Sequence, residues 1–257
     1  MIGVCHICGM SGKLSYEHVP PHSAFNDKPV LYTTLLKLMN KENLDGITGK
    51  KLQRGAGAYT LCERCNSLTG HWYGDAFADW AHQAMNITSA TRRQTTLLHH
   101  FHIFPARIIK QITCMFFSVN SPDFRLAHPA LVRSVLNRDT KYWPSNMHLY
   151  AFYTMSDRSR SAGVTVRADS IGSTMKFHTI SEITFPPFGF LLTIDCTWPD
   201  KSLADISGFA NFDYTDWVCG LTMRLPIMPI YTAYPGDYRS REDVLRQAAE
   251  TSAAIQP

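Results

Sequence analysis

Apolar residues recur every three or four positions through much of the first half of the chain, which is the period of a helix with one buried face. This spacing predicts helices over residues 28–41, 63–72, 75–90, 105–118 and 122–137, and a terminal helix over 240–254. Gly70 and Gly74 predict the end of the helix that starts at residue 63. A glycine-rich stretch from Gly46 to Gly57 predicts a loop.

The pattern changes after Asn137, where β-branched and aromatic residues gather in runs separated by short polar turns. These runs predict strands over 147–155, 163–167, 175–184, 188–197 and 217–225. Short turns favour antiparallel pairing, so we expect an antiparallel sheet of about five strands. The predicted fold class is α+β, with residues 1–75 as an N-terminal unit and residues 76–257 as a module of helices followed by the sheet.

Two groups of aromatic and histidine residues allow either a structural or a functional interpretation. Tyr73, Phe77 and Trp80 could stack on nucleic-acid bases, but their i, i+4, i+7 spacing favours a buried helix face. A second group consists of three histidines beside Phe101. It lacks a carboxylate or cysteine at helical spacing, which disfavours a metal site. These histidines are His99, His100 and His102.

Four of the seven cysteines form two C-x-x-C pairs that bracket a long insertion near the N-terminus. The pairs are Cys5 with Cys8 and Cys62 with Cys65. Two such pairs are typical of a structural zinc site, because each pair supplies two thiolates from one tight turn. The other cysteines are expected to be buried thiols rather than disulfides. They are Cys114, Cys196 and Cys219.

A short motif lies inside the bracket, where Glu17-His18-Val19-Pro20 precedes Leu61-Cys62-Glu63-Arg64-Cys65-Asn66. Together with the first C-x-x-C pair, this arrangement resembles the zinc-bracketed branch of the HNH endonucleases over about residues 1–75. The resemblance implies a ββα-metal (treble-clef) fold with His18 as general base. It also implies that Glu17 and Asn66 bind a catalytic divalent ion, while the four cysteines bind structural Zn²⁺.

The chemistry of these residue types is consistent with that implication. A neutral imidazole can take a proton from water near neutral pH, and a hard ion such as Mg²⁺ prefers the oxygen ligands that Glu17 and Asn66 offer. Where the family carries a structural asparagine, this chain has Gly55-Ala56-Gly57-Ala58. His71 lies one position beyond the place of a further family residue, and is either a third ligand, a phosphate contact or a surface residue.

Charge and hydropathy restrict the possible partners. The formal net charge is only +4, which excludes a polycationic protein that coats DNA. A nuclease needs only a local basic strip, and two candidates are Lys50, Lys51 and Arg54, or Arg92 and Arg93. For each strip taken alone, a solvated surface is the favoured interpretation. The sequence contains no apolar run of transmembrane length and no signal peptide, so we expect a cytoplasmic protein without a membrane partner.

Three functional hypotheses follow. The first is a metal-dependent endonuclease that hydrolyses phosphodiester bonds in DNA rather than RNA, with a bacterial or phage conflict system as one setting. The second is a non-catalytic, zinc-stabilised module that binds nucleic acid or protein. In the third, the C-terminal module gates the nuclease through an activating ligand or a homo-oligomer.

Overall fold

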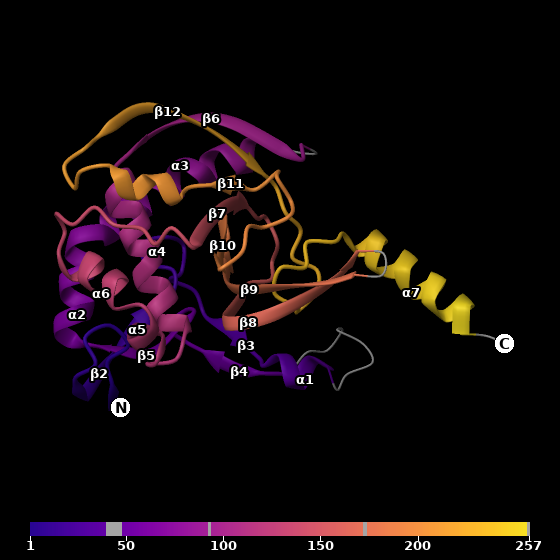
Figure 1. The fold of residues 1–257 in the computed structure, drawn as a ribbon, viewed down its shortest axis with the longest axis horizontal. Helices are drawn as coiled ribbons and strands as arrows, with labels where there is room; N and C mark the ends of the chain where they lie inside the picture. The colour runs from indigo at the N-terminus through magenta and orange to yellow at the C-terminus, as the bar shows by residue number, and fades with distance from the viewer. Residues whose placement is uncertain (40–47, 92–93, 172–173, 256–257) are drawn as a thin grey trace.

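The computed structural model describes residues 1–39, 48–91, 94–171 and 174–255. It is a mixed α+β structure with antiparallel sheets and a four-cysteine cluster near the N-terminus. Helix α4 lies at the centre, with the N-terminal unit below it and the largest sheet beside it (Figure 1). Among the described residues, no helix combines the length and the apolar composition needed to cross a bilayer.

The N-terminal sheet contains three antiparallel strands in the order β1-β2-β5. They are β1 (Ile2–Val4), β2 (Ser11–His18) and β5 (Gly57–Cys62). Leu14 of β2 pairs with Cys62, and His18 pairs with Gly57. The strand carrying the Glu-His motif therefore has one end beside the second cysteine pair and the other end beside the glycine-rich segment.

One continuous helix follows β5 directly. It consists of α2 (Glu63–Thr69), a π-helical turn (Gly70–Gly74) and α3 (Asp75–Ala90), with right-handed helical dihedrals at both junctions. The prediction that Gly70 and Gly74 end the helix is wrong. A helical glycine costs only about 1 kcal/mol relative to alanine, and burial of Tyr73, Phe77 and Trp80 outweighs this cost. The predicted core role of these three aromatic residues is confirmed.

The insertion between the cysteine pairs differs from the predicted helix over 28–41. Residues Val30–Tyr32 form β3, which pairs with β4 (Lys50–Leu52), and the helix α1 covers only Leu35–Met39. Leu31 and Leu36 are 56% and 70% exposed, so the apolar spacing does not face a core that would stabilise a longer helix. Lys41 and Gly46, at the predicted ends, lie outside the described residues.

The largest sheet has five antiparallel strands in the order β11-β7-β10-β9-β8. Their bounds are β7 (Met147–Tyr153), β8 (Arg160–Ile171), β9 (Thr174–Phe185), β10 (Phe188–Ile194) and β11 (Ala204–Asp205). Every residue of β10 is buried. The predicted α+β class and antiparallel sheet are therefore confirmed.

The predicted strand over 217–225 does not belong to this sheet. It forms β12 (Val218–Pro226), which pairs with β6 (Thr96–Ile103) in a separate two-stranded ribbon. The three neighbouring histidines lie on β6. They interrupt the sequence pattern in which buried Leu97, Phe101 and Ile103 alternate with exposed residues. The strand signal is weak because the polar histidines occupy both faces.

The remaining helical segments all follow β6 in the chain. They are α4 (Pro105–Val119), α5 (Phe124–Ala127), α6 (Pro129–Leu136), a 3-10 turn (Ser207–Asn211) and α7 (Arg241–Ile255). The predicted helix over 122–137 is divided at Pro129, because proline disfavours helical dihedrals in the residue before it. Helix α7 starts with reciprocal bonds between Ser240 and Asp243 and extends away from the body (Figure 1).

The first 75 residues and the rest of the chain share one hydrophobic core, which contains Ile7, Leu61, Trp80, Phe117 and Phe188 among others. Two polar contacts also cross from the first segment to α4. The His6 ring Nδ1 lies 3.0 Å from the carbonyl oxygen of Phe117. The Thr60 hydroxyl donates to Ser118 over 3.0 Å. The N-terminal unit is therefore built onto α4.

The segment after β12 is attached to the sheet by a buried ion pair. Arg160 contacts Glu182 over 2.7 Å, and both side chains are at most 6% exposed. The Gly236 amide donates to the second oxygen of Glu182 over 2.8 Å. Next to it, Asp237 accepts hydrogen bonds from Thr232 and Arg239. This network stabilises a loop on the face of the sheet opposite α4.

Candidate metal centre and catalytic segment

The four cysteines of the two C-x-x-C pairs converge. The sulfur atoms of Cys5, Cys8, Cys62 and Cys65 all lie within 4.8 Å of one another. Cys8 Sγ and Cys62 Sγ are 3.7 Å apart, close to the ~3.8 Å edge of a tetrahedron with Zn–S bonds of about 2.3 Å. All four are free thiols. The cluster therefore fits a structural metal ion such as Zn²⁺.

Local backbone geometry explains why the two pairs form this cluster. The first pair lies in a tight turn in which the Gly9 amide donates to the Cys5 carbonyl and the Cys5 amide donates to the Met10 carbonyl. Gly9 has φ +77°, a conformation that favours glycine. In the second pair, Cys62 precedes the first turn of α2 and Cys65 lies in that turn. Each pair thus points two sulfurs to one side of its turn.

The thiols influence one another strongly. A hydrogen bond from the Cys65 thiol lowers the pKa of Cys5 to about 4, and the same contact raises the pKa of Cys65. Burial raises the pKa of Cys8. Four thiols at these distances cannot all ionise without a cation to offset their charge. Zinc binding would supply that charge and couple metal loading to folding.

Glu17 is buried, with 6% of its surface exposed. Burial raises the pKa of Glu17 to about 8, and its charge acts on the interior thiol of Cys114. The carboxyl group makes no ion pair with any residue that the structure describes. A buried carboxyl without a cation is held neutral near pH 7, and a bound cation would restore its charged form. Glu17 is therefore a buried carboxyl group that is mainly neutral near pH 7 in this environment.

His18 is oriented by the backbone of the glycine-rich segment. Its Nε2 lies 2.8 Å from the carbonyl oxygen of Arg54. A carbonyl can only accept, so Nε2 carries the proton and Nδ1 keeps its lone pair in the neutral ring. Burial lowers the pKa of His18; the bond to Arg54 opposes this, and the charges of His22 and Arg54 lower it further. The ring therefore remains neutral at neutral pH, with one nitrogen available as a proton acceptor.

Asn66 connects α2 to the strand that carries the motif. Its Nδ2 donates to the Tyr16 carbonyl over 3.1 Å and to the Ser15 hydroxyl oxygen over 3.0 Å. Because a carbonyl can only accept, these bonds fix the orientation of the amide. They leave Oδ1 as the acceptor atom of the side chain. The structure thus brings Asn66 to the residue that precedes Glu17.

Asn26 is a residue of this site that the sequence did not indicate. It is completely buried, and its Nδ2 donates to the carbonyls of Pro20 and Ala56 over 2.7 Å each. Its Oδ1 accepts from the Ala56 amide over 2.6 Å. Ala56 lies two positions after Arg54, whose carbonyl orients His18. Asn26 therefore holds the loop that positions the imidazole, and no sequence spacing links it to that loop.

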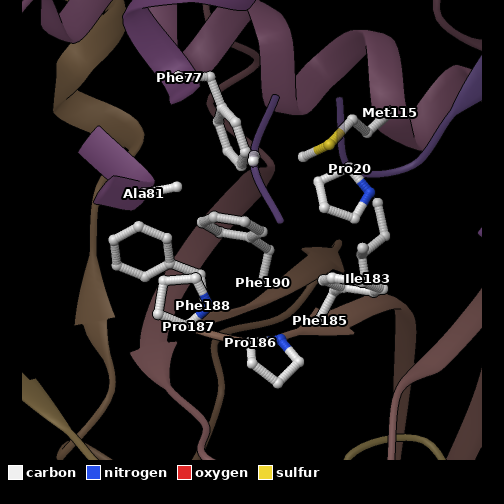
Figure 2. Close-up of a pocket in the computed structure, with 11 residues that line it drawn as sticks. Pro20, Phe77, Ala81, Met115, Ile183, Phe185, Pro186, Pro187, Phe188 and Phe190 are labelled. Carbon is white, nitrogen blue, oxygen red and sulfur yellow. The ribbon is translucent and has the colours of Figure 1, made fainter. Parts of the chain in front are cut away.

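The segment after His18 rests on the large sheet. Pro20 lines a small apolar cavity together with Phe77, Met115, Ile183 and Phe190, as Figure 2 shows. The cavity has a volume of about 10 Å³, at the lower limit for a single water molecule. It is therefore a packing contact rather than a ligand site. It places the motif directly against α3, α4 and the β9–β10 connection.

The other predicted site residues occupy different positions. Lys50 and Lys51 lie on β4, and Arg54 is exposed beside His18. His71 is exposed in the π-helical turn, and among the described residues no contact joins it to Glu17 or Asn66. Arg92 and Arg93 lie outside the described residues.

The remaining cysteines and histidines differ in exposure and grouping. Cys114 is buried and Cys196 is half-buried, but Cys219 is exposed, so the prediction of three buried thiols is wrong for Cys219. Its position on the separate β6–β12 ribbon leaves one face in solvent. Within the described ranges, the four-cysteine cluster is the only group of three or more metal-binding side chains. It does not include the histidines of β6.

Comparison with known proteins gives no match: no family model, curated protein or solved structure matches this chain.

Proposed function

We propose that the protein is a metal-dependent endonuclease of the HNH type that hydrolyses phosphodiester bonds in DNA. The observation that supports this most directly is the geometry of His18. Its Nε2–H is bound by a backbone carbonyl, and among the described residues no hydrogen bond occupies Nδ1 of this half-buried ring. A general base needs a proton acceptor that is fixed in position and neutral at working pH.

In this proposal His18 takes a proton from the attacking water at Nδ1. Glu17 and the Oδ1 atom of Asn66 hold a divalent ion, and hard oxygen donors suit Mg²⁺. When bound, the ion supplies positive charge for the scissile phosphate and the leaving oxygen. Arg54 adds a positive charge beside the imidazole, where a phosphate would lie. Zn²⁺ at the four cysteines stabilises the fold and takes no part in the reaction.

Asn26 provides a role that the sequence motif lacks. The resemblance implies a structural asparagine near residues 55–58, where the chain has only glycine and alanine. Asn26 comes from the other side of the insertion and binds both backbone groups of Ala56 within that stretch. We infer that it replaces the missing residue and fixes the carbonyl that orients His18.

A non-catalytic binding module is the second candidate, and the burial of Glu17 favours it. A carboxyl that is 6% exposed and has a raised pKa can exist as a neutral structural group. In that case zinc would stabilise a surface for nucleic acid or protein, and no second metal would bind. The C-terminal module would then serve recognition or assembly rather than gating.

Titration of divalent ions in a cleavage assay tests the proposed metal ligands. We expect Asn66→Ala to require a higher Mg²⁺ concentration for half-maximal cleavage of plasmid DNA, while its zinc content stays unchanged. Asn86→Ala is a matched control, because Asn86 is exposed on α3. An unchanged Mg²⁺ requirement in Asn66→Ala would remove Asn66 from the ligand set. Metal-independent behaviour of the folded, zinc-loaded wild type would favour the binding module.

A further inference from the structure

Four aromatic rings form a row across the N-terminal sheet and the segment after it. Tyr59 lies 5.4 Å from Tyr16, Tyr16 lies 5.0 Å from His18, and His18 lies 5.3 Å from His22, measured between ring centroids. All three contacts are edge-to-face. The candidate base is therefore an inner member of a continuous row, with one ring beyond it and two before it.

Both ends of this row are accessible to solvent. Tyr59 is 40% exposed, and His22 is exposed as well. Neither residue belongs to the two hydrophobic core clusters. The inner ring of Tyr16 is fixed, because its hydroxyl donates to the Gly55 carbonyl over 2.8 Å. Glu17, between Tyr16 and His18 in sequence, is buried instead, so the row marks the solvent side of β2.

The row also carries positive charge. Arg54 is exposed, and its own carbonyl binds the His18 ring. The guanidinium group of Arg54 acts electrostatically on Tyr16 and His18, which are the two inner rings of the row. Exposed aromatic rings beside a cation are the two features that proteins use to bind single-stranded nucleic acid.

We propose that this row binds an unpaired nucleic-acid strand, with a base stacked on Tyr59 and the sugar-phosphate backbone passing Arg54 and His22. This inference rests on the proposed nuclease function and specifies its substrate as single-stranded or locally unpaired DNA. An unpaired base offers its face to an aromatic side chain, whereas the bases of a duplex cover one another. Tyr59 is two ring contacts from His18, so the stacked base belongs to a nucleotide near the scissile phosphate.

A purely structural role makes a different prediction. Tyr16 and Tyr59 are direct cross-strand partners in the β2–β5 pair. Such aromatic pairs stabilise a sheet by about 0.2–1 kcal/mol without any ligand. If the pair is only structural, its loss should change the affinities for single-stranded and double-stranded DNA equally. The ratio of the two affinities therefore separates the two roles.

The test uses the zinc-loaded wild-type chain as background, so that the row keeps all four rings, with no added Mg²⁺, so that no cleavage disturbs binding. The probes are a fluorescein-labelled twenty-nucleotide oligo-dT strand and a labelled duplex of the same length, and the readout is fluorescence anisotropy. We expect Tyr59→Ala to weaken single-strand binding by about 5- to 150-fold, the equivalent of losing one stacked base. Duplex binding should change by less than about twofold, because a duplex base does not stack on Tyr59.

Two controls separate stacking from folding and from general exposure. Tyr59→Phe keeps a ring for stacking and should bind the single strand like the background protein. Tyr142→Ala removes a tyrosine of similar exposure, 39%, from the loop between α6 and β7, outside the row, and should change neither affinity. Thermal unfolding of each variant confirms that it is folded.

Each outcome decides a specific point. Equal or absent effects of Tyr59→Ala on the two probes would overturn the single-strand proposal, even if the wild type cleaves DNA with Mg²⁺. Selective loss of single-strand binding, together with no cleavage by the wild type, would support the strand-binding row and refute the nuclease.

Discussion

The buried side chain of Asn26 gives the sharpest test of how the site is held together. We predict that Asn26→Ala destabilises the protein and disorders the position of His18. The substitution removes three hydrogen bonds of 2.6–2.7 Å. The Ala56 carbonyl keeps another donor, the Val19 amide. The Pro20 carbonyl and the Ala56 amide lose the partners that Asn26 provides.

The magnitude follows from those contacts. Each hydrogen bond contributes about 0.5–1.5 kcal/mol net, and a buried polar group left without a partner costs about 1–3 kcal/mol. The two backbone groups left without a partner cost about 2–6 kcal/mol together, and the third lost bond adds about 0.5–1.5 kcal/mol, so we expect a loss of about 2.5–7.5 kcal/mol. Since a domain has a total stability of about 5–15 kcal/mol, this is a large fraction.

Urea denaturation of the zinc-loaded protein measures the change in the free energy of unfolding. Asn86→Ala serves as a matched control, because this asparagine is exposed on α3 and should change the stability by less than about 0.5 kcal/mol. Hydrogen exchange at the Ala56 amide adds a local measurement, and it should become faster in Asn26→Ala. A loss below about 1 kcal/mol, with unchanged exchange at Ala56, would refute the view that Asn26 holds this loop.

Further expectations concern the loop, the metal cluster and the sheet. Gly55→Ala should destabilise by about 1–3 kcal/mol, because Gly55 has φ +85° and an added Cβ would meet the Asn26 carbonyl; equal urea midpoints for variant and wild type would contradict this. Cys62→Ser should lose bound zinc and unfold the N-terminal sheet, whereas Cys219→Ser keeps the metal, and zinc analysis of both variants checks it. Burial alone would raise the pKa of Asp237, but hydrogen bonds from its arginine and threonine partners outweigh it and lower the pKa to about 2. A carboxyl group with a depressed pKa contributes stability above its pKa in the unfolded chain, which is near 4. We therefore expect the free energy of unfolding to fall by about 1–2 kcal/mol between pH 4 and pH 2. Asp237→Asn should flatten this pH dependence in acid unfolding, and an unchanged slope would show that Asp237 does not cause it.

The sequence predicted the parts of the structure that local patterns determine. The two C-x-x-C pairs converge because each forms its own tight turn, and α4 starts at Pro105 as its spacing indicated. The strands β7 to β10 follow from dense β-branched and aromatic runs. In each case the residues that form the element are the residues that specify it.

Other features depend on contacts between distant segments, which no local pattern shows. Gly70 and Gly74 remain helical because buried residues fix the helix on both sides of them, with Cys65 and Thr69 before and Phe77 and Trp80 after. The ribbon between β6 and β12 joins segments more than a hundred residues apart. Asn26 reaches the Ala56 backbone across the insertion, so only the folded chain identifies it as part of the site.

Part of the candidate site was also predictable from the sequence. His18, Glu17 and Asn66 were expected to lie together, and Asn66 does contact the residue before Glu17. The orientation of the His18 ring and the burial of Glu17 could be known only from the structure, since both depend on the backbone that surrounds them. Their role in catalysis stays a prediction.

Cleavage of supercoiled plasmid DNA by purified, zinc-loaded protein tests the central proposal most directly. Wild type, His18→Ala and the exposed-histidine control His100→Ala are compared with Mg²⁺, with Mn²⁺ and without added metal. The proposal predicts metal-dependent nicking by wild type and His100→Ala and none by a folded, zinc-loaded His18→Ala. Nicking by His18→Ala at the wild-type rate would contradict the assignment of the base, and no nicking by the wild type would contradict the nuclease itself.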